Sequence, residues 1–411
     1  MRETCGLWWM LLGLLCGPAV AQRVWIVDVA GGPGTDFTQI AAALASPLVS
    51  GGDVLRVRAG DYEAFVTDKG VAVLGEGTVR IGDFSGTLPT TSVVVQGLPA
   101  GAVFTMANVL VGHSCTNARA AIMLNDTAGR VHLENVDTQG IGYPTWLQPT
   151  VRSVWLLRCR LLTWNGGRVA GGGGIYADTS TLALTGVVSY GIRGTDLGIR
   201  IIPSTPGLEL WSSEAFVCAT DLVGGNGDGN VSASPGLRAN VLFESSRVHL
   251  AGAATNSVRA GFGGPTPAIR MRSNTLIYDP TVQLVPSGGA AAIESSGLVE
   301  ARPVGFVAGH GAPLGGTAEA RVHSPPGTLV FLALGLPTVG QASPFGPLYL
   351  DLASMVPLAV GVQGALGVTV QPLPVPSVPE LRGLAIGLQA AVTYPPGNET
   401  GLTNPTAIVL D

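Results

Sequence analysis

The feature of this chain that most restricts its fold is a short polar pair that recurs within otherwise apolar sequence. Five such pairs occur, with spacings of 33, 33, 28 and 22 residues between them: Thr179-Ser180, Ser212-Ser213, Ser245-Ser246, Ser273-Asn274 and Ser295-Ser296. Recurrence at intervals of this length indicates a repeat architecture, in which each repeat contacts only its neighbours.

Small or apolar residues alternate with other residues on both sides of each pair. Those expected to face inward before the pairs are Ile175/Ala177, Leu208/Leu210, Val241/Phe243, Ile269/Met271 and Ala291/Ile293. Those expected to face inward after the pairs are Leu182/Leu184, Ala215/Val217, Val248/Leu250, Leu276/Tyr278 and Leu298, with Glu300 breaking the series. Alternation with a period of two predicts strands, so each unit is predicted to be two strands that meet at a tight polar corner.

Stacked coils explain these units better than other repeat folds. Ankyrin and TPR repeats need two helices with a period of 3.6, and a propeller blade needs four strands. In a stacked coil each corner recurs about 4.8 Å above the previous one. Hydroxyl and amide side chains can then bond backbone groups that the bend leaves unpaired. Two earlier segments, 121–133 with Ile122, Leu124, Val131 and Leu133 inward, and 151–161, fit the same pattern more loosely.

The segment before these coils has a distinct order of elements. An apolar strand over 24–29 is followed by a helix over 37–45 with Asp36 as its N-cap, a strand over 54–57, and Gly60-Asp61-Tyr62. This order resembles the N-terminal cap of pectin-lyase-like right-handed parallel β-helix proteins. The resemblance implies an all-β fold, a right-handed parallel β-helix over residues 22–310, with a short N-terminal capping helix.

The first residues have the layout of a secretory signal peptide. Arg2 precedes an apolar run over 7–15, and Ala19-Val20-Ala21 forms a small-x-small cleavage site. The run is shorter than the about 20 apolar residues that a spanning helix needs. We therefore expect a signal peptide over 1–21, a mature chain without a transmembrane helix, and a secreted or cell-surface location. Lipidation at Cys16 and an uncleaved anchor are the alternatives.

The sequence pattern changes after residue 310. Strand-sized apolar runs follow at irregular intervals, separated by proline-rich stretches and without the polar corner. This pattern predicts a small C-terminal β-sandwich module over 311–411. Residues 381–392 resemble the small C-terminal module of many large secreted bacterial proteins, a resemblance that carries no chemistry.

Composition and cysteine usage exclude several functions. The net charge is −5 and Lys69 is the single lysine, so the basic footprint that nucleic acid requires is absent. Cys115, Cys159 and Cys218 follow the signal peptide without a zinc-binding spacing, and we expect small buried residues. Their disulfide state and the oligomeric state cannot be read from the sequence. We expect no metal and no cofactor.

Positions between the inward residues are expected to form outward columns. One column holds Asp178, Trp211, Glu244, Arg272 and Glu294, and its neighbour holds Tyr176, Glu209, Leu242, Arg270 and Ala292. Aromatic rings stack on sugar faces, while carboxylates and guanidinium groups bind hydroxyl or uronate groups. The candidate substrate-binding residues are therefore Tyr176, Asp178, Glu209, Trp211, Glu244, Arg270 and Arg272. The alternative is an ordinary solvated face with cross-strand ion pairs.

These observations favour a secreted or surface protein that binds polysaccharide or cell-envelope glycan without catalysis. A divergent polysaccharide lyase or glycoside hydrolase is the first alternative. Asp178 and Glu244 would lie about 10 Å apart, near the about 6.5–9.5 Å of inverting glycosidases. However, the Asn-Thr-Asp element and Asp-Asp pair of β-helix polygalacturonases are missing, and Gly309-His310-Gly311 lacks partner carboxylates. A structural stalk or adhesin spacer is the second alternative.

Overall fold

A computed structural model describes residues 22–84, 91–114, 120–141, 154–157, 160–165, 168–170, 174–196, 201–202, 204–227, 231–240, 245–252, 256–394 and 399–410. The chain divides into two compact units, one over Val24–Val304 and one that combines Gln22 and Arg23 with the residues from Gly305 onward. The division therefore falls slightly before the predicted boundary at residue 311.

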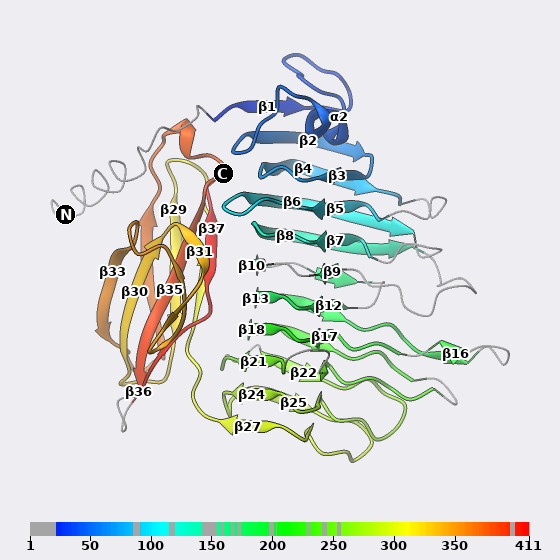
Figure 1. The fold of residues 1–411 in the computed structure, drawn as a ribbon, viewed down its shortest axis with the longest axis vertical. Helices are drawn as coiled ribbons and strands as arrows, with labels where there is room; N and C mark the ends of the chain where they lie inside the picture. Colours follow the sequence, from blue (N-terminus) through cyan, green and yellow to red (C-terminus); the bar gives the residue numbers. More distant parts are fainter. Residues whose placement is uncertain are drawn as a thin grey trace. The chain divides into compact units, whose positions relative to one another are not determined.

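The first unit is a parallel β-solenoid (Figure 1). One of its sheets has nine strands and provides what we call the first face. Its strands are β3 (Phe65–Thr67), β5 (Val93–Gln96), β7 (Ile122–Asn125), β9 (Val154–Leu157), β12 (Ile175–Asp178), β17 (Leu208–Trp211), β20 (Leu237–Asn240), β23 (Ile269–Met271) and β26 (Ile293–Ser295). Neighbouring coils pair in parallel along the whole sheet.

A second, larger sheet forms the rest of each coil. It starts with β1 (Val24–Val27), β2 (Val54–Tyr62), β4 (Ala72–Gly82), β6 (Val103–Ser114) and β8 (Arg130–Ile141). Strand β8 pairs with both β10 (Arg160–Asn165) and β11 (Arg168–Ala170), so later coils have two short strands where earlier ones have a single long strand.

These later strands form a second and a third face. The second face continues through β13 (Thr181–Thr185), β18 (Glu214–Cys218), β21 (Arg247–Leu250), β24 (Thr275–Tyr278) and β27 (Leu298–Ala301). The third continues through β14 (Val188–Tyr190), β19 (Asp221–Val223), β22 (Ser257–Arg259) and β25 (Gln283–Val285). A small hairpin of β15 (Thr195–Asp196) and β16 (Ile201–Ile202) lies between β14 and β17.

The polar corners connect the first face to the second, as predicted. The backbone N–H of Ser180 donates to Ser213 Oγ at 3.0 Å, and that of Ser213 donates to Ser246 Oγ at 3.1 Å. Ser246 N donates in turn to Asn274 Oδ1 at 2.5 Å. The residue that begins the corner turns the chain with a left-handed φ of 47° at Thr179, 46° at Ser212 and 52° at Ser273. Each corner is thus satisfied by the side chain one coil further on.

Most of the predicted inward residues of the first four corners are confirmed. Ile175, Ala177, Leu208, Leu210, Ile269 and Met271 are all buried on the first face. Leu182, Leu184, Ala215, Val217, Val248, Leu250 and Leu276 are buried on the second face, with Tyr278 packed against them. Ile122, Leu124, Val131 and Leu133 of the earlier coil are fully buried as well.

The predicted alignment at the third corner is wrong. The strand that continues the first face is β20, whose Leu237 and Ala239 are buried and in register with Leu208 and Leu210. Residues 241–244, which were predicted to be this strand, lie outside the described residues. Leu237/Ala239 and Val241/Phe243 are both spaced by two, so alternation alone could not distinguish them.

The last coil is also misaligned in the prediction. Ile293 pairs with Ile269 and Ala291 lies outside the strand, while Val299 rather than Leu298 pairs with the buried Leu276. Leu298 is 55% exposed. Glu300 pairs with Ile277, so the apparent break in the alternation came from a register shifted by one residue.

The helix near the N-terminus is shorter than predicted. Helix α2 covers Ile40–Ala45 and buries Ile40, Ala43 and Leu44 in the solenoid core. The predicted N-cap is wrong, because Gln39 occupies that position and Asp36 Oδ2 instead accepts the N–H of Ile26 at 2.8 Å. The Asp36 carboxylate therefore fixes the loop to β1 rather than starting the helix.

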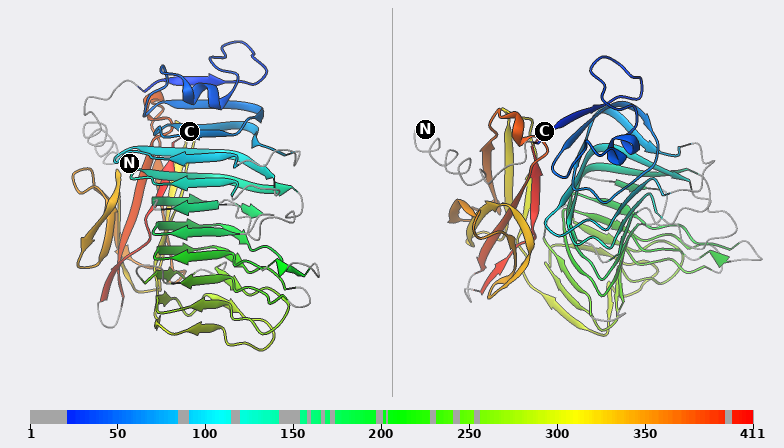
Figure 2. Two further views of the ribbon diagram at one scale, coloured as in Figure 1. Left: turned by 45° about the vertical axis from the view of Figure 1, so that its right-hand side comes forward. Right: turned by 45° about the horizontal axis from the view of Figure 1, so that its top comes forward.

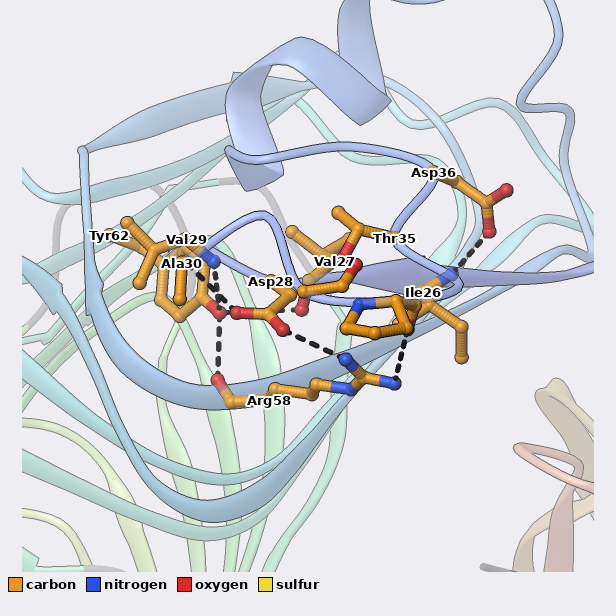
Figure 3. A network of polar contacts seen from close by, with 11 residues as sticks. Ile26, Val27, Asp28, Val29, Ala30, Thr35, Asp36, Arg58 and Tyr62 are labelled. Atoms are coloured by element: carbon orange, nitrogen blue, oxygen red, sulfur yellow. Dashed lines mark hydrogen bonds and ion pairs between the residues drawn. The ribbon is translucent and has the colours of Figure 1, made fainter.

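A polar network ties the loop after β1 to β2 (Figure 3). Asp28 accepts hydrogen bonds from Arg58 Nη1 at 2.8 Å and from the N–H of Ala30 at 2.9 Å. The Tyr62 hydroxyl donates to the carbonyl of Arg58 at 2.7 Å and accepts the N–H of Val29 at 3.3 Å. The hydrogen bond from Arg58, followed by that from Ala30, holds the pKa of Asp28 below its usual value.

The second unit consists of antiparallel sheets. One contains β28 (Phe306–His310), β29 (Thr317–His323) and β34 (Val368–Pro374). The other contains β30 (Leu329–Gly335), β33 (Val356–Val362), β35 (Ala385–Tyr394), β36 (Glu399–Leu402) and β37 (Thr406–Val409). β31 (Pro337–Ser343) pairs with β32 (Gly346–Leu350), and a 3₁₀ turn, η1, covers Pro379–Leu381. Val322 and Leu332 belong to one buried cluster that contains side chains of both larger sheets.

His310 lies in β28, so the Gly309-His310-Gly311 element belongs to this unit and not to the end of the solenoid.

Removing one corner hydroxyl should destabilise the solenoid. In Ser213→Ala, the buried N–H of Ser180 loses its acceptor, and we expect a loss of about 1–3 kcal/mol in the free energy of unfolding. The matched control is Ser245→Ala, because Ser245 is an exposed corner serine and should cost less than about 0.5 kcal/mol. Urea unfolding of both variants measures the difference. Equal stabilities would contradict a contribution from this series of corner hydrogen bonds, which we call the corner ladder.

Replacing Asp28 should give a pH-dependent loss of stability. Because the folded state lowers the pKa of Asp28, its contribution is present above the unfolded value of about 3.9 and is lost as the pH falls through the lower folded value. Asp28→Asn should therefore melt below the parent chain at neutral pH, and the difference should shrink in acid. Thermal melts across this pH range test it, and a difference that grows in acid would contradict the assignment.

Candidate functional site

Six of the seven predicted binding residues lie on the outer side of the first face, and Glu244 lies outside the described residues. Tyr176, Glu209, Arg238, Arg270 and Glu294 are in register on successive strands and form one column. Asp178, Trp211 and Asn240 form the next, and Arg272 follows directly after β23. We call these nine residues the strip.

The strip differs from the prediction at two coils. Arg238 and Asn240 take the places predicted for Leu242 and Glu244, and Glu244 lies outside the described residues. Glu294 pairs with Arg270 rather than following Arg272, and Ala292 precedes the strand. The coil two above Asp178 therefore presents an amide, so the sheet register gives no support to an Asp178–Glu244 carboxylate pair.

The indole of Trp211 is held in place by its neighbour. Trp211 Nε1 donates to Glu209 Oε1 at 3.2 Å, and Glu209 is only 5% exposed. On the preceding coil, Thr179 Oγ1 donates to Asp178 Oδ1 at 2.9 Å. These bonds fix a partly exposed ring beside oriented carboxylates, which is the combination that sugar recognition uses.

The charges of the strip are balanced. Arg270 Nε lies 3.0 Å from Glu294 Oε2, and the register places Arg238 beside Glu209. Asp178 and Arg272 complete three carboxylates and three guanidinium groups. Partly exposed pairs of this kind add little to the free energy of unfolding, about 0–1 kcal/mol each. Their main effect is on the charge pattern of the strip.

Towards the N-terminus the first column becomes apolar, whereas the second continues by register through Leu157, Asn125 and Gln96. The column of Tyr176 continues by register through Trp155, Met123, Val94 and Val66. Trp155 was not predicted as a site residue, although its apolar strand was noticed. At this end a hollow of about 440 Å³ is lined by Val66, Thr67, Asp68, Gln96, Gly97, Asn125 and Asp126.

The third face carries a polar cluster that the sequence reasoning missed. Asp221 Oδ2 accepts from Arg259 Nη2 at 3.0 Å, Arg259 Nε donates to Ser257 Oγ at 3.1 Å, and the Ser257 hydroxyl donates to Asp221 Oδ1. Tyr190 lies on the same face and is 37% exposed. The signal was available as three polar residues on strands in register, but these strands are only three residues long.

Loops that follow the third face stack on one another beside this cluster. Gly191 N donates to Val223 O at 2.7 Å, and Gly225 N donates to Thr205 O at 2.9 Å. A Cβ at Gly225 would lie 1.7 Å from the carbonyl oxygen of Ile192, so only glycine allows this approach. Figure 2 shows these loops extending outward from the coils, and Phe262 on them is 76% exposed.

Metal binding and thiol chemistry depend on where the His, Cys, Asp and Glu side chains lie. Among those residues, no group of three or more His, Cys, Asp or Glu side chains could hold a metal ion. Cys218 is a free thiol whose burial raises its pKa to about 12, so it is unreactive at neutral pH. Cys115 and Cys159 lie outside the described residues.

No protein-family model matches the chain, and no curated protein matches it. Within the residues described, no helix combines the length and the apolar character needed to cross a membrane.

Proposed function

We propose that this protein is secreted or held at the cell surface and binds a polysaccharide or cell-envelope glycan through the strip, without catalysis. The observation that carries the proposal is the Trp211–Glu209 pair, an aromatic ring fixed beside a carboxylate on a flat outer sheet. The secreted location rests on the signal-peptide pattern of residues 1–21.

The strip suits an extended sugar chain for three physical reasons. Coils repeat about every 4.8 Å, so binding groups recur at a spacing comparable to one sugar unit. Trp211 is already held by Glu209, so little side-chain freedom is lost on binding. The balanced charges leave polar groups that can bind hydroxyls without strongly attracting or repelling ions.

The proposal includes finer features of the fold. We infer a right-handed coil whose N-terminal helix α2 covers the first turn, from the resemblance of residues 24–62 to the cap of pectin-lyase-like proteins. We also infer that the antiparallel sheets after residue 305 form a small sandwich module, since side chains of both larger sheets belong to one buried cluster.

One observation favours the lyase or hydrolase alternative. The Asp221–Ser257–Arg259 cluster lies beside stacked loops, and an enzyme site needs such loops around its groups. However, Arg259 is engaged by Asp221 at 3.0 Å, whereas proton abstraction needs a base with an available lone pair. Binding without turnover is therefore the better-supported function.

A glycan array tests the proposal, combined with activity assays on the same panel. The mature chain from Gln22 onward should bind at least one polysaccharide class and release neither reducing ends nor unsaturated uronates. Release of either product would replace the proposal with the enzyme alternative. A complete lack of binding would leave only the structural stalk.

Substitutions in the strip should weaken any binding found. Trp211→Ala removes the ring, and we expect affinity to fall about tenfold, since an aromatic contact contributes about 0.5–1.5 kcal/mol beyond its buried area. Trp211→Phe keeps a stacking surface and should retain most of the affinity. Arg272→Ala should also weaken binding, with Arg321→Ala in the second unit as its matched control. Unchanged affinity in both Trp211→Ala and Arg272→Ala would show that the strip is the wrong face.

A further inference from the structure

A hollow of about 350 Å³ lies at the corner between the first and second faces. All of its lining residues are polar: Thr179, Ser180, Thr181, Ser212, Ser213, Glu214, Ser245, Ser246, Arg247 and Thr275. Its volume is at the small end of the about 300–1,000 Å³ of typical ligand sites. The hollow is therefore large enough for one small polar group and has no apolar side chains to bury.

The hollow has a fixed floor between two walls. The floor is the corner ladder, where Ser180 Oγ donates to Asp178 O and Ser213 Oγ donates to Trp211 O, both at 2.7 Å. One wall holds the corner residues Thr179, Ser212 and Ser245. The other holds Thr181, Glu214, Arg247 and Thr275, which are in register on β13, β18, β21 and β24. Because the floor hydroxyls are used by the backbone, a ligand would be bound by the walls.

Glu214 and Arg247 face each other across neighbouring coils. Arg247 Nη1 lies 3.8 Å from Glu214 Oε1, longer than a direct hydrogen bond, and the Arg247 side chain is 59% exposed. His249 Nε2 lies 3.6 Å from the same oxygen, and the His249 ring stacks on Phe216 with centroids 4.5 Å apart. Glu214 is thus flanked by both side chains, and Arg247 still reaches solvent.

The hollow adjoins the strip. Asp178 and Trp211 directly precede Thr179 and Ser212, so the strip's second column borders the first wall. A glycan that stacks on Trp211 needs to extend only around the corner to reach Glu214 and Arg247.

We propose that this hollow is a subsite for one neutral pyranose unit of the glycan, which rests on the function proposed for the strip. A carboxylate accepts hydrogen bonds from adjacent sugar hydroxyls, and a guanidinium donates to hydroxyl or ring oxygens. The opposite charges of Glu214 and Arg247 cancel, so the hollow has no net attraction for a uronate or an amino sugar. The wall hydroxyls add further donors and acceptors.

The test uses a graded series of cello- and manno-oligosaccharides, with oligogalacturonates as the charged comparison, and isothermal titration of the mature chain. We expect binding of a neutral series, and a loss of about tenfold in Glu214→Gln, since a hydrogen bond to a charged carboxylate becomes a weaker one to a neutral amide. Thr181→Val should weaken binding less, because it removes one wall hydroxyl while nearly preserving shape. The matched control is Glu319→Gln, an exposed carboxylate paired with Arg321 in the second unit, which should bind like the parent chain.

Circular dichroism and melting temperature establish that each variant is folded, and Thr181→Val keeps the test valid if Glu214→Gln unfolds. A loss of affinity in Trp211→Ala without a loss in Glu214→Gln or Thr181→Val would overturn the subsite and leave the strip's function intact. Tighter binding of oligogalacturonates than of both neutral series would overturn the neutral ligand class. Absence of binding to every series overturns the subsite, and a blank glycan array in addition would overturn the proposed function itself.

Discussion

The fold depends on one hydrogen bond that repeats from coil to coil, from a corner backbone N–H to the side-chain oxygen of the next corner. At Ser180 and Ser213 this bond satisfies a buried N–H that neither strand can use. The same hydroxyl also donates within its own corner, as Ser213 does to Trp211 O. Both strands leave the corner at a fixed angle as a result, and the first and second faces keep that angle in the coils that these bonds connect.

The candidate sites are consequences of this repetition. Stacking in register turns single residues into columns, so Trp211 lies beside Asp178 on one side and Asn240 on the other. The left-handed residues Thr179, Ser212 and Ser273 turn the chain between the strip and the hollow. Neither surface needs a specialised loop, because both are built from strand and corner positions. The third face differs, since its polar cluster is accompanied by loops that only glycine allows to stack closely.

Much of the solenoid could be predicted from the sequence, because two independent signals indicate the same strands. These signals are the polar corner pairs and the alternation of apolar residues. Strand positions such as Ile175/Ala177 and Leu182/Leu184 were correct for that reason. The prediction failed where one signal was missing. At the third corner extra residues separate β20 from Ser245, and a period of two cannot reveal them. Asp36 was misassigned because a carboxylate before a helix can equally bond a neighbouring strand. Glu214 and Arg247 stand at equivalent outward positions and could have been found from the same register. The hollow between them could not, since alternation does not encode the corner's angle.

The direction of the ladder bears on how the chain acquires its structure. Each N–H belongs to the earlier coil and its acceptor belongs to the later one, as in Ser180 to Ser213, Ser213 to Ser246 and Ser246 to Asn274. A chain synthesised from its N-terminus therefore has an unsatisfied newest corner until the following coil emerges. Growth of the solenoid is coupled to the arrival of new sequence, and an interruption in synthesis would leave the last completed coil with its backbone open to a foreign strand.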